Sequence, residues 1–113
     1  MDAFLYLQVR PGTVEDVVVQ LGTNGTINPE DFDRMMGILQ GRKVILLNSK
    51  VPRPWEEQVN QTIADGANRY KATLIDWHTI ASEHPEFFWD DGIHLRPEGA
   101  AFYAQLIAQH VTP

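Results

Sequence analysis

The sequence predicts an α/β domain in which a parallel β-sheet is covered by helices on both faces. Short, β-branched apolar runs suited to strands buried on both faces alternate with stretches in which apolar residues recur at helical spacing. The length of 113 residues is enough for one domain with a real core, yet short for a complete α/β enzyme. We therefore expect residues 1–113 to form a single, partial domain.

The first half of the chain predicts two strands separated by a helix. Residues 16–21 form a valine-rich run, and residues 43–48 form a second apolar run that is also typical of a buried strand. Between them we expect a helix over residues 29–40, with Asn28 as its N-cap and Gly41 as its stop. Residues ahead of the first run fit either a strand or the tail of a helix.

The second half continues the alternation with a helix, a strand and two more helices. Along a helix that begins near Trp55, apolar residues recur at spacings of three and four: Val59, Ile63, Ala67 and Tyr70. Residues 72–76 are predicted as the third strand and residues 77–83 as a short helix. Pro97 opens the last helix, whose expected inner face consists of Phe102, Leu106, Ile107 and His110.

The composition excludes several classes of partner. A net charge of -6, with nine scattered basic residues, argues against nucleic acid and anionic membrane, both of which favour clustered Lys and Arg. The absence of cysteine excludes a disulfide framework and a thiolate metal site. There is no signal-peptide pattern and no apolar run of membrane-spanning length, so we expect no direct membrane insertion by this segment.

Polar residues follow each predicted strand. In an open parallel sheet, ligands bind outside the carboxyl ends of the strands. Gly22-Thr23-Asn24-Gly25 leaves the first strand, Asn48-Ser49 the second and Asp76-Trp77 the third, while residues 91–94 lead into the final helix on the same side. We expect these segments to meet at one edge.

Asp91 and His94 are the strongest candidates for chemistry. A carboxylate three residues before an imidazole can accept its ring N–H, orient it and stabilise its charged form, as a general base requires. The pair lacks a nucleophile, because the two serines of the chain, Ser49 and Ser82, do not lie in a Gly-x-Ser-x-Gly pattern.

Simpler interpretations stay open at this point. Asn24 between two glycines could donate to an oxyanion, but an Asx-turn explains the same pattern and is favoured when Asn24 is taken alone. The acidic residues around His94 could suggest a metal, but no ligand pair at zinc spacing supports it, so we predict no metal and no cofactor. Packing in the core or a cleft wall is favoured for the three tryptophans, Trp55, Trp77 and Trp89.

Four blocks together resemble the later motifs of the SGNH (GDSL-type) hydrolase family. They are Leu21–Gly25, Val51–Trp55, Ile75–Trp77 and Asp91–Gly99, in the family's order from about Asp16 onward. The chain is most similar to the C-terminal extracytoplasmic SGNH domain fused to membrane acyltransferases of the peptidoglycan O-acetyltransferase type. The resemblance implies a flavodoxin-like, three-layer α/β/α fold, and an extracytoplasmic, cell-envelope location if the chain is part of such an acyltransferase.

The resemblance also implies roles for individual residues. His94 would be the general base, Asp91 its orienting acid and Asn24 the side-chain oxyanion donor. The expected substrate is an acylated carbohydrate or another small ester. The predicted substrate-binding residues are Gly22, Thr23, Gly25, Ser49 and Trp55.

One departure from the family is clear, because the Gly-Asp-Ser block that supplies the nucleophile is not found. The expected function is therefore that of an ester hydrolase or O-acyltransferase domain that is incomplete at its N-terminus. The main alternative is a non-catalytic carbohydrate- or partner-binding module, and an in-frame Gly-Asp-Ser segment upstream would argue against it. A phospho-accepting switch is weaker, since only Asp76 would suit it.

Loss of the first strand would leave residues 16–21 with an open side. We expect the chain to form homo-oligomers through that edge, to cover it with residues 4–9, or to aggregate.

Overall fold

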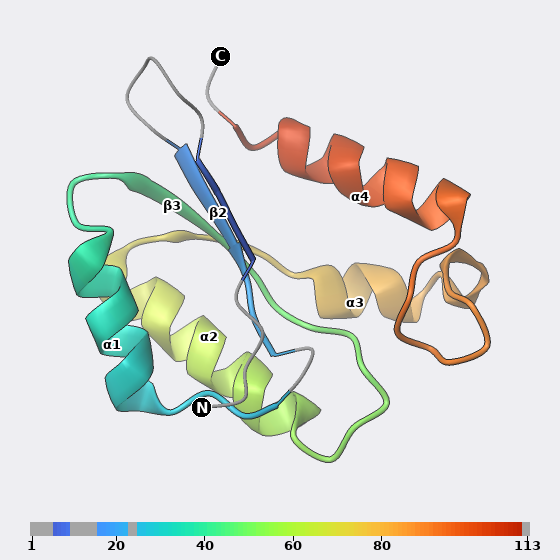
Figure 1. Ribbon diagram of the computed structural model, residues 1–113, viewed down its shortest axis with the longest axis horizontal. Coiled ribbons are helices and arrows are strands. Elements are labelled where there is room, and N and C mark those ends of the chain that lie inside the picture. The colour runs from blue at the N-terminus through green and yellow to red at the C-terminus, as the bar shows by residue number, and fades with distance from the viewer. Residues whose placement is uncertain (1–5, 10–15, 23–24, 112–113) are drawn as a thin grey trace.

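The computed structural model describes residues 6–9, 16–22 and 25–111, with the backbone alone for residues 6–9. A four-stranded sheet of order β1-β2-β3-β4 runs through the molecule (Figure 1). Its strands are β1 (Tyr6–Val9), β2 (Asp16–Gln20), β3 (Lys43–Leu47) and β4 (Thr73–Ile75). Strands β2, β3 and β4 are parallel, as the sequence predicts, whereas β1 is antiparallel to β2.

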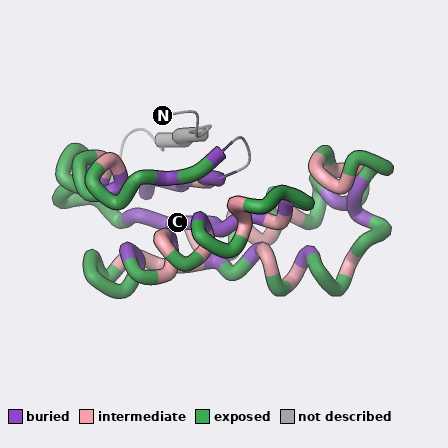
Figure 2. The backbone as a smooth tube through the Cα atoms, turned by 90° about the horizontal axis from the view of Figure 1, so that it is seen from below, coloured by how far each residue is buried: buried purple, intermediate pink, exposed green. Residues whose placement is uncertain are grey.

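Helices cover both faces of this sheet, which confirms the predicted α/β layers (Figure 2). On one face, α1 (Pro29–Ile38) and α2 (Glu56–Tyr70) pack on alternate strand residues such as Val17 and Val19. On the other face, α3 (Trp77–Ser82), the 3₁₀ turn η1 (Pro85–Phe87) and α4 (Pro97–Ala108) cover Val18 and Ile45. Strands β2 and β3 therefore bury both of their faces, which explains their continuous apolar runs.

The open side predicted for β2 is occupied by β1. The pairing runs from Tyr6 opposite Gln20 to Val9 opposite Val17. Of the three expected outcomes, the structure thus has the one in which residues from the start of the chain cover this edge.

Two details of the helices differ from the sequence prediction. Helix α1 ends at Ile38, because Gln40 and Arg42 donate to carbonyls three residues back and Gly41 adopts a φ of +87°. Phe102 is not on the inner face of α4: it lies over the rings of His84 and Phe87 and stays partly exposed.

Tyr103 takes the inner position instead, with its ring 4.8 Å from that of Trp77. The two rings meet edge to face, and Leu106 and Ile107 of α4 pack against the same cluster.

Helices α1 and α2 approach closely at a glycine. The ring of Phe32 lies against Gly66, where an added methyl group would come within 2.1 Å of Phe32 Cε1. A larger residue at this position would force the helices apart. Over the ranges that the structure covers, no helix is both long and apolar enough to cross a bilayer.

Candidate active site

The segment that leaves β2 is held in place by two side chains from distant parts of the chain. The buried hydroxyl of Ser49 donates to the carbonyl of Leu21, and the indole N–H of Trp55 donates to the carbonyl of Gly22 over 2.9 Å. These bonds fix the backbone just before Thr23 and Asn24. Thr23 and Asn24 themselves, and hence the predicted cleft shared by Asn24 and His94, lie outside the described residues.

Only glycine fits at position 22. Gly22 has a φ of +101°, which residues with a side chain rarely adopt. A methyl group there would lie 2.3 Å from Val59 Cγ1 and 2.9 Å from the Ser49 hydroxyl. The close packing of the backbone at Gly22 on α2 therefore requires glycine at this position.

The side chain of Asn60 in α2 holds the backbone of Ser49. The Ser49 N–H donates to Asn60 Oδ1 over 2.8 Å, and Asn60 Nδ2 donates back to the Ser49 carbonyl over 2.8 Å. Gln20 Nε2 also donates to the Ser49 hydroxyl over 3.3 Å. The predicted site residue Ser49 is thus joined to the ends of β2 and β3 and to α2.

A second network links the ends of β3 and β4. Asn48 Nδ2 donates to Asp76 over 2.9 Å, and its Oδ1 accepts the backbone N–H of His78 over 2.7 Å. Partial burial raises the pKa of Asp76, but hydrogen bonds from Asn48 and Thr79 outweigh it and leave the pKa below its ordinary value. Asp76 thereby serves as the N-cap of α3, a role that occupies both of its oxygens.

His78 and Glu56 extend this network over the loop that follows β3. His78 Nε2 lies 3.1 Å from Glu56 Oε1, and Glu56 Oε2 accepts the N–H of Val51 over 2.7 Å. Neither residue was singled out by the sequence, because their pairing spans 22 positions and leaves no local pattern.

The predicted pair of Asp91 and His94 forms as expected from its spacing. His94 Nδ1 lies 2.5 Å from Asp91 Oδ2, while Asp91 Oδ1 accepts the backbone N–H groups of Ile93 over 2.8 Å and of His94 over 3.0 Å. The His94 side-chain hydrogen bond, followed by the two backbone N–H groups, lowers the pKa of Asp91 from 3.8 to about 2.

This geometry determines what the His94 imidazole can do. An ionised Asp91 only accepts hydrogen bonds, so Nδ1 carries the ring proton and the lone pair of the neutral ring is on Nε2. The His94 side chain is 78% exposed and that of Asp91 43%. Nε2 can therefore take a proton from a group that reaches it from solvent.

The loop that carries the pair borders the loop that follows β3. A methyl group placed on Gly92 would be 3.4 Å from Pro52 Cγ. The loop is closed by antiparallel pairing, with Phe88 opposite Leu95 and the N–H of Trp89 donating to the carbonyl of His94 over 2.9 Å. His94 is thus presented from a short hairpin next to the carboxyl end of the sheet.

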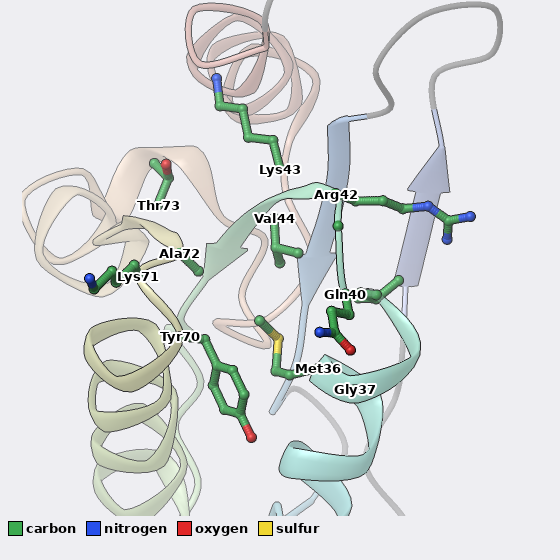
Figure 3. Close-up of a pocket in the computed structure, with 12 residues that line it drawn as sticks. Met36, Gly37, Gln40, Arg42, Lys43, Val44, Tyr70, Lys71, Ala72 and Thr73 are labelled. Carbon is green, nitrogen blue, oxygen red and sulfur yellow. The ribbon is translucent and has the colours of Figure 1, made fainter.

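A separate cavity of about 400 Å³ lies at the other end of the sheet, where β3 and β4 begin. Met36, Val44 and Ala72 contribute to its lining, but the charged ends of Arg42 and Lys71 point away from each other (Figure 3). Over the described ranges, no three His, Cys, Asp or Glu side chains gather as they would around a metal ion.

Comparison with known proteins shows which sequences this chain is similar to. No family model matches the chain. It is 39% identical over 94 residues to YrhL of Bacillus subtilis, a provisionally named peptidoglycan O-acetyltransferase, and 33% identical over 91 residues to the peptidoglycan O-acetyltransferase OatA of Listeria monocytogenes. The chain is homologous to a segment of these proteins.

A provisionally named O-acetyltransferase of Staphylococcus aureus strain COL is 40% identical over 86 residues. These matches cover 75% to 82% of this chain. They cover only 14% to 15% of the relatives' lengths, so the chain corresponds to a small part of each of these relatives.

Proposed function

We propose that this chain is the base-bearing part of an SGNH-type domain that transfers or hydrolyses acyl groups, acetyl above all, on carbohydrate O-acyl esters. The observation that carries the proposal is the 2.5 Å pairing of His94 with an ionised Asp91 on an exposed loop. Homology to a segment of peptidoglycan O-acetyltransferases supports the same chemistry.

In the proposed reaction a serine hydroxyl attacks the acyl carbon of the ester. His94 Nε2 takes the proton of that hydroxyl and later returns it to the leaving alcohol, while Asp91 holds the ring and stabilises its charged form. Asn24 donates its amide N–H to the oxyanion of the tetrahedral intermediate. The reaction needs no metal or cofactor.

Ser49 and Trp55 serve this site through the backbone. Their hydrogen bonds to Leu21 and Gly22 fix the chain within three residues of Asn24, so they orient the turn that binds the acyl group. The nucleophile is not Ser49, because its buried hydroxyl is already donated to Leu21. The attacking serine belongs to a Gly-Asp-Ser block that these 113 residues do not supply.

The relatives support a proposal for the substrate class and the location. Their names identify peptidoglycan as the acceptor of the acyl group in those proteins. We extend this to the present chain and propose that it acts on an acylated cell-envelope carbohydrate, outside the cytoplasm.

The test is a chimera in which this chain replaces the homologous segment of the Listeria relative, assayed for acetyl transfer to peptidoglycan. His94→Ala and Asn24→Ala should each lower the rate by at least about a hundredfold. The matched control is His84→Ala, because His84 also pairs with a carboxylate, that of Glu86, over 2.9 Å, but on η1. Equal loss in the control and in His94→Ala would overturn the assignment.

The chain alone should turn over an aryl acetate only slightly. Without its serine such a site retains at most a residual acceleration on the order of 10³ to 10⁴ over water. A folded chimera that binds peptidoglycan but does not acetylate it would instead favour the non-catalytic binding module.

A further inference from the structure

Trp89 lies opposite His94 across the hairpin that carries the Asp91–His94 dyad. Phe88 lies opposite Leu95, and the next pair in this antiparallel register is Trp89 opposite His94, joined by the 2.9 Å hydrogen bond from Trp89 N–H. Side chains of directly opposed residues point to the same face of a hairpin. The Trp89 and His94 side chains therefore leave the same face of the hairpin.

Trp89 differs from the other two tryptophans in its exposure. Trp77 is 4% exposed in the core, and Trp55 is partly buried with its indole N–H bound to Gly22. Trp89 is 48% exposed and belongs to neither core cluster. Its large apolar ring is thus left partly in solvent, on the hairpin that carries the proposed base.

The exposed ring is nevertheless held in place. The Trp89 carbonyl accepts the N–H of Gly92 over 2.9 Å, so both backbone polar groups of Trp89 are bonded within the hairpin. The guanidinium of Arg96 lies over one face of the ring, 4.4 Å from its centroid, and Arg96 Nε donates to the carbonyl of Phe88 over 3.0 Å. Binding on such a restrained ring costs little side-chain entropy.

We propose that Trp89 is a stacking platform for a pyranose ring of the glycan that carries or receives the acyl group, through the indole face opposite Arg96. The C–H groups on one face of a pyranose are apolar and pack flat on an indole, while its hydroxyls stay at the rim. The identity of the glycan as the acyl substrate rests on the proposed function.

A sugar seated on this ring would have its substituents beside His94. The platform then explains how a shallow, exposed dyad can select a polymeric carbohydrate over a small ester, because binding energy is gained from a ring next to the reacting one. Phe102 is also partly exposed, but its ring packs against those of His84 and Phe87.

The test is an NMR titration of the full chain with a soluble β-1,4-linked tetramer of N-acetylglucosamine. The chain has three tryptophans and so three indole N–H signals, and Trp89→Phe identifies the one from Trp89. We expect that signal to shift and saturate while those of Trp55 and Trp77 stay in place. Trp89→Ala should weaken binding, followed by backbone amide shifts in residues 90–96, by about fivefold or more.

Two measurements separate this proposal from the catalytic one: the affinity of Trp89→Ala for the tetramer and the activity of the chimera. Phe102→Ala serves as the matched exposed-aromatic control and should bind the tetramer with unchanged affinity. Unchanged affinity in a folded Trp89→Ala chain, or no binding by the unmodified chain, would overturn the platform and leave the role of His94 standing. Binding that depends on Trp89 in a chain whose chimera is inactive would overturn the proposed function alone.

Discussion

Ser49→Ala is the sharpest test of how the site is built. The side chain of Ser49 is fully buried, its hydroxyl donates to the Leu21 carbonyl and accepts from Gln20, and Leu21 is itself buried. Alanine removes the donor and leaves that carbonyl without its partner, which costs about 1–3 kcal/mol. The two bonds from Asn60 survive, because they use the main chain of Ser49.

The expected change in melting temperature follows from the size of the chain. An unfolding entropy of about 2.1 cal/mol/K per residue gives about 0.24 kcal/mol/K for 113 residues, so Ser49→Ala should lower Tm by roughly 4–13 °C. Thermal unfolding followed by circular dichroism measures this directly.

The chain offers a matched control in its other serine. Ser82 is exposed and its hydroxyl donates to the His78 carbonyl within α3, so Ser82→Ala should change stability by no more than about 0.5 kcal/mol. Equal Tm values for the two variants would refute the bond to Leu21. Covalent acylation of the Ser49 hydroxyl during turnover of the chimera, detected by mass spectrometry, would refute our exclusion of Ser49 as nucleophile.

Three further predictions concern the dyad, the helix pair and the sheet edge. An NMR titration of the Asp91 carboxyl should have its midpoint near pH 2, and His94→Ala should move that midpoint towards 3.8. The stabilisation that ionised Asp91 provides is complete above about pH 4 and is lost as the pH falls to 2. A midpoint that His94→Ala leaves unchanged would contradict the pairing. In urea unfolding, Gly66→Ala should lower the free energy of unfolding by about 1–3 kcal/mol, because the added methyl group overpacks against Phe32. Gly37→Ala, whose added methyl group meets no atom within 4 Å, should raise it by about 0.5–1 kcal/mol. Equal effects of the two variants would refute the close helix contact. Deleting residues 1–9 should expose β2 and cause association visible by light scattering, and a monomeric deletion variant would show that β1 does not protect this edge.

Local patterns in the sequence were sufficient for the parallel strands and most helices. A run such as Val17–Val19 indicates a strand buried on both faces whatever lies beside it, and Asn28 and Pro29 define a helix start within a few residues. The pairing of Asp91 with His94 was predictable for the same reason, since it joins residues three positions apart within one loop.

Contacts between distant residues were decided by the tertiary structure. The hydrogen bonds from Ser49 to Leu21 and from Trp55 to Gly22 join residues 28 and 33 positions apart, and no periodic pattern in the sequence predicts them. The sequence predicts packing for Trp89, but its ring is half exposed, because exposure depends on which surfaces the folded chain leaves uncovered. Sequence periodicity reports which residues avoid water, whereas the direction and partner of each polar group are fixed only when separate elements meet.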